Sequence, residues 1–331
     1  MGSHVRAAGV GGHTGVSEPL VSIVLLTWNG GSGLRELVAA IARQQTDFAY
    51  EVVAVDSGST DGSPEWLEQS PAVARVARIP STQFNHGTTR NLGIEQSRGA
   101  FIVLIVQDAI PTSDDWLARL VAPLRRDPRV AGTFCRQRPR PDARAITAGY
   151  LEGWAGAAPE PRRVAFDDAR ALEALDPGSQ LQACTFDNVC SCLRRSVWQQ
   201  IPFRATVIAE DLEWAQRALQ AGHSLEYVAD AAVVHSHDRT AAYELARTYL
   251  LHHRLFELFG LRTIPRARDL PRAIASTTRR HLQYERDARE AGQGAAGRWR
   301  ALGLAIAWPL GQYLGGLSAS KGYKPVRWRA V

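Results

Sequence analysis

The chain has 331 residues, 45% of them hydrophobic and 22% charged, and its 39 Lys and Arg against 33 Asp and Glu leave a formal net charge of +6. This composition is typical of a folded protein and excludes disordered, collagen-like and disulfide-scaffold chains. The length predicts one large domain with an appendage, or two domains. The basic excess favours phosphate-bearing ligands or anionic surfaces without choosing between them.

The cysteines and the N-terminus indicate a cellular compartment. Cys135, Cys184, Cys190 and Cys192 are too sparse for a disulfide framework and lack the paired spacing of a zinc site. We therefore expect them to be reduced and buried. Residues 1–20 contain no apolar core of the length that a signal peptide needs. We expect this segment to be disordered or a tag remnant, and the protein to be cytoplasmic.

The first half of the chain alternates apolar strands with helices. Residues 21–27 and 50–56 are continuous aliphatic runs, which are typical of strands buried on both faces. Strand and helix in alternation predict a mainly parallel α/β sheet. A loop is expected at residues 84–93. The expected strands span residues 21–27, 50–56, 73–79 and 100–107, and the expected helices span residues 33–45 and the residues that follow Ser63.

The second half of the chain begins irregularly and ends in helices. Residues 136–180 are rich in Pro, Arg, Asp and Ala and predict a long irregular excursion over the surface. We divide the chain into a start at 1–20, an α/β domain at 21–240 and a helical region at 241–331. The further expected elements are a helix at 210–221, a strand at 225–235 and helices at 241–259, 271–291 and 299–317.

Polar side chains follow four of the apolar strands. Each group alone is also typical of turns and helix caps. Ligands of open α/β sheets bind at the carboxyl ends of the strands, so together the groups predict one ligand site. The groups are Thr27, Trp28 and Asn29; Asp56, Ser57 and Ser59; Gln107 and Asp108; and His235 and His237.

Residues 21–240 resemble the family-2 glycosyltransferases of the GT-A fold. The motifs that carry the resemblance are Val24–Asn29, Val53–Gly62, Arg90–Gly93, a hydrophobic strand that ends in an aspartate, and Ala209–Glu213. The resemblance implies an α/β nucleotide-sugar-binding domain of GT-A type with a mostly parallel central sheet, followed by a C-terminal helical region. Within the family, Phe84–Gly87 and Gln107–Ala109 are most similar to bacterial rhamnosyltransferases that use dTDP-L-rhamnose.

The resemblance also implies which residues bind a dTDP- or UDP-sugar donor. Trp28 suits stacking on the base or core packing equally well, and Arg90 suits recognition of the base or phosphate, or a surface ion pair. The implied donor-binding residues are Thr27, Trp28, Asn29, Asp56, Ser59, Asn85, His86, Arg90, Gln107 and Asp108.

A divalent metal on the donor diphosphate is implied as well. Asp108 is the implied ligand of Mg²⁺ or Mn²⁺, because such cations bind carboxylate oxygen, and His235 completes the site with His237 as its substitute. A buried histidine with a satisfied partner is the structural alternative. Most family members have two acidic residues at this place, whereas this chain has Gln107. We therefore expect metal binding to depend on the phosphates of the donor.

The acidic pair Glu210 and Asp211 opens an expected helix, where the helix dipole favours ionised carboxylates. An acidic first turn is also a common cap. The resemblance implies that Asp211, with Glu210 as its substitute, is the general base of a single inverting displacement. Asp187 and Asn188 are implied to face the sugar and the acceptor, a saccharide or polyprenyl-linked saccharide of O-antigen or capsule synthesis.

The helix expected at 299–317 is interrupted by Pro309, Gln312 and several glycines, and it falls short of a membrane span. Cations and aromatic residues flank it, which is typical of a helix in the headgroup layer. Packing on the catalytic domain or in a homodimer explains the pattern equally well. The flanking residues are Arg298, Arg300, Lys321, Lys324, Arg327 and Arg329, with Trp299, Trp308, Tyr313, Tyr323 and Trp328. The cations among them concentrate the basic excess at the C-terminus. This position favours the anionic inner face of the cell membrane over nucleic acid as the partner of the basic residues.

Two other functions are alternatives. Gly31 and Gly33 after the first strand, with Asp56 after the second, suggest an NAD-type oxidoreductase, but Glu36 replaces the third glycine of that fingerprint and would repel a pyrophosphate. The sequence pI near 9.4 suggests a nucleic-acid-binding protein. We expect no nucleic acid partner, because the sequence has no zinc finger, helix-turn-helix or RNP motif and its basic residues are dispersed.

Overall fold

The computed structural model describes residues 18–292 and 297–326. The expectation of a disordered start or tag remnant falls mostly on residues 1–17, which lie outside the described ranges. Arg327, Trp328 and Arg329 of the expected basic flank and the side chain of Arg298 also lie outside them.

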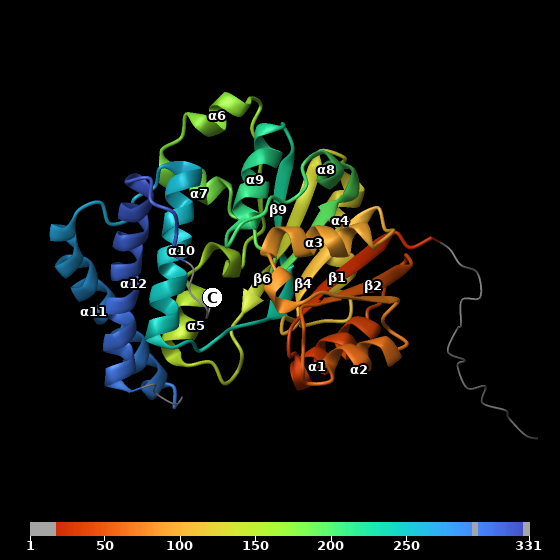
Figure 1. Cartoon of the computed structure of the whole chain (residues 1–331), viewed down its shortest axis with the longest axis horizontal. Coiled ribbons are helices and arrows are strands. Elements are labelled where there is room, and N and C mark those ends of the chain that lie inside the picture. The colour runs from red at the N-terminus through yellow and green to blue at the C-terminus, as the bar shows by residue number, and fades with distance from the viewer. Residues whose placement is uncertain (1–17, 293–296, 327–331) are drawn as a thin grey trace, which may run out of the picture.

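In the described part of the chain, nine strands form one mixed sheet at the centre of the molecule (Figure 1). They are β1 (Val21–Thr27), β2 (Tyr50–Asp56), β3 (Arg75–Arg78), β4 (Phe101–Val106), β5 (Ile110–Pro111), β6 (Val130–Arg138), β7 (Arg162–Val164), β8 (Cys190–Arg194) and β9 (Ser224–Val234). Their order is β3-β2-β1-β4-β8-β6-β9-β5, and β7 pairs with β9 outside this path.

The direction of the strands gives the sheet a single functional edge. β8 is antiparallel to both of its neighbours, β4 and β6. β6 and β9 therefore run in the same direction as β1, β2 and β4. The carboxyl ends of these five strands lie along one edge, which confirms the expected α/β fold with a mostly parallel sheet.

Helices cover both faces of this sheet (Figure 1). On one face lie α1 (Gly31–Ala42), α2 (Ser63–Gln69) and α4 (Trp116–Arg126), and on the other lie α3 (His86–Glu95), α8 (Arg195–Gln200) and α9 (Glu210–Gln220). Successive residues of a strand point to opposite faces, so β1 contributes Ile23 and Leu25 to one core and Val24 to the other. Burial on both faces explains why β1 has no polar alternation.

Two expected irregular segments are ordered, so these expectations are wrong. Residues 84–93 contain most of α3, because the Oδ1 of Asn85 accepts hydrogen bonds from the backbone N–H groups of Gly87 and Thr88 at 3.1 and 3.2 Å and caps the helix. Residues 136–180 contain the end of β6, α5 (Ala145–Glu152), β7, α6 (Ala169–Glu173) and part of α7 (Pro177–Ala183). Their polar composition reflects short elements at the surface rather than missing structure. The four cysteines are free and buried, as expected.

The helical region consists of α10 (Ala241–Phe259), α11 (Leu270–Glu290) and α12 (Arg298–Ser320). Figure 1 shows α10 between the sheet and α12, with α11 on the outer side of α12. Leu255 and Phe259 of α10 join the core on the α9 face of the sheet. The helical region therefore shares a hydrophobic core with the α/β domain. Short 3₁₀ turns are η1 (Ser81–Gln83), η2 (Ala155–Ala157) and η3 (Ala267–Asp269).

Glycines bring the backbones of α12 and α10 close together. A Cβ atom at Gly311 would lie 2.9 Å from the carbonyl oxygen of Leu245, and one at Gly315 would lie 2.3 Å from that of Tyr249. The glycines that interrupt the apolar pattern of α12 are therefore packing positions. None of the described helices is both long and apolar enough to cross a membrane.

We predict that Gly315→Ala destabilises the protein by about 1–3 kcal/mol, because the new methyl group meets the backbone of α10 and forces the helices apart. Gly316→Ala is the matched control, since its Cβ would lie 3.5 Å from the flexible Arg262 side chain. The control should be neutral or slightly stabilising, because alanine favours helix. Urea unfolding measures both variants, and equal effects would contradict the packing role of Gly315.

Candidate active site

The four polar groups expected at strand ends lie along the shared carboxyl edge of the sheet. Gln107 follows β4 and holds the turn after β1. Its Oε1 accepts hydrogen bonds from the Thr27 hydroxyl and the Trp28 backbone N–H at 2.8 Å each, and its Nε2 donates to the Trp28 carbonyl at 3.0 Å. The Trp28 side chain is 59% exposed. The core-packing alternative is therefore wrong, and the exposed indole can stack on a planar ligand.

Asp56 and Asn29 join this turn to the loop that follows β2. Asp56 is 1% exposed. Its Oδ1 accepts hydrogen bonds from the N–H groups of Gly58 and Ser59 at 3.0 Å each, and its Oδ2 accepts one from the Ser59 hydroxyl. The Asn29 N–H donates to Ser59 Oγ at 2.8 Å, and Asn29 Oδ1 accepts from the Thr60 N–H at 2.8 Å. Asn29 has a φ of 48°, a conformation that asparagine tolerates. The two loops form one rigid rim.

Asp108, His235 and His237 form a cluster at the same carboxyl edge, where the chain leaves β4 and β9. The Nε2 atoms of His235 and His237 lie 3.7 and 3.2 Å from the two carboxylate oxygens of Asp108 and 3.1 Å from each other. Pairing of β5 with the end of β9 brings the Asp108 loop beside His235. The sequence therefore correctly anticipated that these three side chains meet.

The donor set of this cluster fits a divalent metal ion. The three ligand atoms lie within 4.8 Å of one another. Burial lowers the pKa of His235 to about 4, and it also lowers the pKa of His237, so both imidazoles are neutral at pH 7 and can act as ligands. Two imidazoles and one carboxylate suit Mn²⁺ better than Mg²⁺, which prefers oxygen ligands.

Gln137 connects this cluster to a group of carboxylates. Its Nε2 donates to Asp187 Oδ2 at 2.7 Å, and its Oε1 lies 3.0 Å from the Nδ1 of His235. Because the amide oxygen can only accept, Nδ1 of His235 carries the proton and Nε2 faces Asp108 with its lone pair. The other oxygen of Asp187 accepts from the Val189 N–H at 2.7 Å.

Glu210 and Asp211 open α9, as expected, but their surroundings differ. Glu210 forms a buried ion pair with Arg90, whose Nη1 lies 3.0 Å from Glu210 Oε1, and both side chains are 6% exposed. The same oxygen accepts from Asn188 Nδ2 at 3.2 Å. The surface ion pair considered for Arg90 is therefore wrong in its location, because the pair is buried. The expected recognition of a donor by Arg90 stays a prediction.

The two carboxylates of the pair have opposite electrostatic environments. Burial raises the pKa of Asp211 well above its ordinary value, and the charges of Glu210 and Asp187 raise it further. Burial alone would also raise the pKa of Glu210, but the charges of Arg90 and His86 outweigh it and the pKa lies below its ordinary value. Asp211 therefore binds a proton more readily than a surface aspartate, although the helix dipole alone would favour ionisation.

The motif that includes Asn85 and His86 connects α3 to the segment before α9. Asn85 Nδ2 donates to the Thr206 carbonyl at 2.8 Å, and its Oδ1 caps α3. The carbonyl oxygen of His86 accepts a hydrogen bond from Arg90 Nη1 at 2.8 Å. A Cβ atom at Gly87 would lie 2.0 Å from the Arg204 carbonyl oxygen. These contacts hold the start of α9; donor binding by Asn85 and His86 stays a prediction.

Sequence reasoning missed three polar residues at this site. Gln137 and Arg140 lie in the segment expected to be irregular, and Arg140 Nη2 donates to the Asp108 carbonyl at 3.0 Å. Arg247 on α10 acts electrostatically on Asp187 and His86. Gln137 follows the apolar run Val130–Cys135, just as the other site residues follow apolar strands, and this pattern could have identified it. No local signal marks Arg247, because only the packing of α10 brings it here.

We predict that Glu210→Gln and Asp211→Asn change stability in opposite directions at pH 7.5. Glu210→Gln leaves the Arg90 charge buried without its partner and should cost about 3–5 kcal/mol. Asp211→Asn removes a carboxylate whose ionised form is disfavoured in the folded state, so it should stabilise the protein.

The pH dependence provides the control. Because the folded-state pKa of Asp211 is raised, the wild-type protein loses stability as the pH rises from about 4 through that pKa, and Asp211→Asn removes this loss. Urea unfolding from pH 4 to 8 should show the advantage of Asp211→Asn growing with pH. A constant difference would contradict the electrostatic origin.

Comparison with known proteins agrees with this fold. Residues 22–163 match the family model for glycosyl transferase family 2. The O-antigen chain rhamnosyltransferase RfbN of Salmonella typhimurium is 29% identical over 234 residues, which cover 69% of this chain and 70% of the relative. The O-antigen chain rhamnosyltransferase WbaN of Salmonella anatum is 27% identical over 236 residues, which cover 70% of each chain.

A solved structure supports the architecture. The mannosyltransferase PcManGT from Pyrobaculum calidifontis, in complex with GDP-Man and Mn²⁺, superimposes with a TM-score of 0.53 at 20% identity, covering 94% of this chain and 77% of that one. This likeness shows a common fold. The family match and the two rhamnosyltransferase relatives support a glycosyltransferase rather than the oxidoreductase or the nucleic-acid-binding protein. The chain contains a glycosyltransferase family 2 domain with a GT-A-like fold, followed by a C-terminal helical region.

Proposed function

We propose that this glycosyltransferase moves L-rhamnose from dTDP-L-rhamnose to a saccharide or lipid-linked saccharide acceptor, with inversion, in the synthesis of a cell-surface polysaccharide. The observation that carries the proposal is the position of Asp211, with its raised pKa, on the same sheet edge as the Asp108, His235 and His237 cluster. The similarity to two O-antigen chain rhamnosyltransferases supports the sugar and the pathway class.

The rim of the site would hold the nucleotide. Trp28 offers an exposed aromatic face for the base, and Thr27, Asn29 and Ser59 present polar atoms beside it. Asp56 is buried beneath the rim, where its three hydrogen bonds keep the loop in shape. A rim that is already ordered lowers the entropic cost of binding the donor.

Asp108, His235 and His237 would hold Mn²⁺ or, less favourably, Mg²⁺. A divalent cation at this place neutralises charge on the diphosphate as it leaves. Gln137 orients His235 for this role. Gln107 stands where most family members have a second acidic residue, and here its side chain holds the turn after β1 instead. Metal affinity then depends on one carboxylate, two imidazoles and the donor's own phosphates.

Asp211 would act as the general base. The acceptor hydroxyl oxygen forms a bond to the anomeric carbon while the bond from that carbon to the diphosphate oxygen breaks, and the hydroxyl proton moves to a carboxylate oxygen of Asp211. Attack opposite the leaving group inverts the anomeric centre. The raised pKa makes Asp211 a stronger base than an exposed aspartate, and the Arg90 partner leaves Glu210 less suited to the same role.

A donor panel tests the proposed function. We predict turnover with dTDP-L-rhamnose and little or none with UDP- and GDP-sugars, measured as release of the nucleotide with Mn²⁺ or Mg²⁺ present. Asp211→Asn should lower turnover about 10²–10⁴-fold while leaving dTDP affinity nearly unchanged. Asp108→Ala should instead weaken metal-dependent dTDP binding. Near-normal turnover of the Asp211 variant would show that another group is the base.

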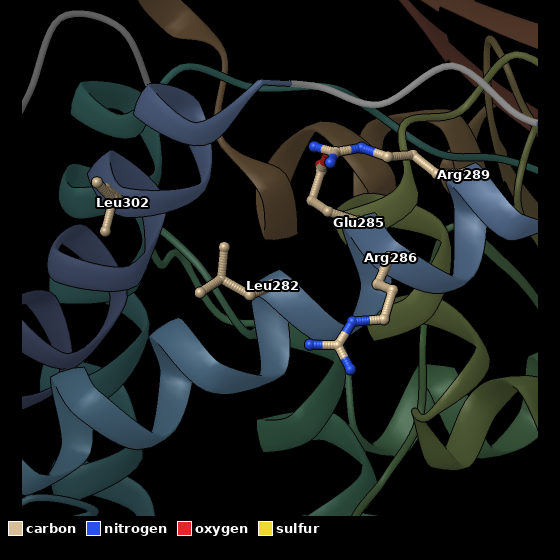
Figure 2. A pocket seen from close by; sticks show the side chains of 5 residues that line it. All are labelled: Leu282, Glu285, Arg286, Arg289 and Leu302. Carbon is tan, nitrogen blue, oxygen red and sulfur yellow. The ribbon is translucent and has the colours of Figure 1, made fainter.

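We also propose that the protein binds the anionic inner face of the cell membrane through α11 and α12. The outer face of α12 carries exposed apolar side chains at helical spacing, with Trp299 87%, Leu302 38% and Ile306 49% exposed. Figure 2 shows Leu302 across from Leu282 of α11, with Arg286 further along the same helix and Arg289 beyond it, next to Glu285. Apolar groups beside cations suit a lipid surface with negative headgroups.

One contact of α12 supports a position of this surface near the candidate active site. Arg300 of α12 lies 3.8 Å from a carboxylate oxygen of Asp238, which is next in sequence to His237. A membrane bound at Trp299 and Leu302 would therefore be close to the candidate active site. This position suits an acceptor whose lipid stays in the bilayer.

We predict that the double substitution Leu302→Ser and Ile306→Ser abolishes flotation with vesicles that contain phosphatidylglycerol. Phe84→Ser is the control, because its ring is 40% exposed on the α/β domain. Wild-type protein should not float with vesicles of phosphatidylcholine alone. Equal flotation of the double variant, or a homodimer in light scattering that this variant dissociates, would overturn the membrane assignment.

A further inference from the structure

A cavity of about 540 Å³ lies where α10 and α11 meet α12 and α5. Its residues come from both the helical region and the segment 136–180. The residues that line it include Tyr150, Glu244, Arg247, Thr248, Arg280, Trp308 and Gln312.

The cavity has an excess of positive charge. Among the described residues, neither Arg247 nor Arg280 forms an ion pair with a carboxylate. Arg280 lies over the ring of Tyr150 at 5.7 Å. Glu244, the acidic residue in the lining, accepts a hydrogen bond from Trp308 Nε1 at 2.9 Å. Arg280 also hydrogen-bonds the Tyr150 side chain. A guanidinium has five N–H donors, so Arg247 and Arg280, which have no carboxylate partner, can still donate to an anion.

The remaining lining suits a sugar. Within the described residues, the side chains of Thr248, Ser276, Thr277 and Gln312 make no hydrogen bond and can bind hydroxyl groups. The rings of Tyr150 and Trp308 meet edge to face with centroids 4.3 Å apart and form an aromatic wall. A few polar groups on an aromatic wall are typical of small-molecule sites.

The cavity also lies near the candidate active site. Arg247 lines it and acts electrostatically on Asp187, where its charge opposes the effect of burial. Asp187 in turn raises the pKa of Asp211, after burial and Glu210. Thr147, one turn before Tyr150 on α5, donates to Asp238 Oδ1 at 2.6 Å, and Asp238 follows His237, so the cavity also adjoins the Asp108, His235 and His237 cluster.

We propose that this cavity is an acceptor subsite that binds a phosphate-bearing saccharide, with Arg247 and Arg280 on the phosphate. The inference rests on the proposed function, because it assumes that the acceptor hydroxyl is activated at Asp211. It extends that function by assigning a binding site and a chemical class to the acceptor.

The test measures binding of glucose 1-phosphate to the full chain by calorimetry, with dTDP and Mn²⁺ at saturation. We expect binding in the presence of dTDP, and at least a ten-fold loss of affinity in both Arg247→Gln and Arg280→Gln. Arg279→Gln is the matched control, because Arg279 is exposed, adjacent in sequence on α11 and absent from the lining. It should bind like the wild type.

Other outcomes separate the subsite from the proposed function. If dTDP does not bind the wild type, the proposed function fails. Three results with dTDP bound would show that the subsite is wrong while the proposed function stands. Glucose 1-phosphate would compete with dTDP, would not bind at all, or would bind with an affinity that neither substitution changes. Inorganic phosphate that binds as tightly as glucose 1-phosphate would indicate an anion site without a saccharide and would also overturn the inference.

Discussion

The buried ion pair between Arg90 and Glu210 is the interaction on which the catalytic half of the molecule depends. It joins α3, which follows the loops after β1 and β2 in the chain, to the start of α9. Both charges are nearly excluded from water, so the pair is maintained only while both helices keep their positions. Asp211 follows Glu210 directly and is therefore held at the sheet edge by a bond that it does not make itself. The ion pair also makes the two carboxylates different, since Arg90 neutralises the charge of Glu210 whereas the pKa of Asp211 stays raised.

A second constraint is the polarity of Gln137. One end of its amide donates to Asp187 and the other accepts from His235, so a single side chain relates the carboxylate group to the imidazole cluster. Reversing the amide would place a carbonyl against a carboxylate, which is unfavourable. The parallel direction of β6 and β9 makes this possible, because it brings the end of β6 to the edge where β9 delivers its histidine. Backbone topology thus sets the protonation pattern of the site.

The C-terminal helices complete the site from outside the sheet. Close packing at Gly311 and Gly315 holds α12 on α10, and α10 carries Arg247 toward the carboxylates. The same packing leaves the opposite face of α12 exposed, with its apolar residues beside the arginines of α11. The small residues of α12 therefore lie on the face that packs on α10, and its exposed large apolar residues lie on another face.

The sequence by itself determined the strands that are buried on both faces, the polar groups at their carboxyl ends and the family. Continuous apolar runs and local turn residues carry that information without reference to the rest of the chain. It placed a loop over most of α3, whose cap is a single asparagine, and it did not reveal the short elements of residues 136–180. Only the tertiary structure decided that Trp28 is exposed, that Arg90 is neutralised by Glu210, and that Gln137 and Arg247 belong to the site. These facts depend on contacts between residues more than 40 positions apart, and such contacts form only when the sheet and its helices are assembled.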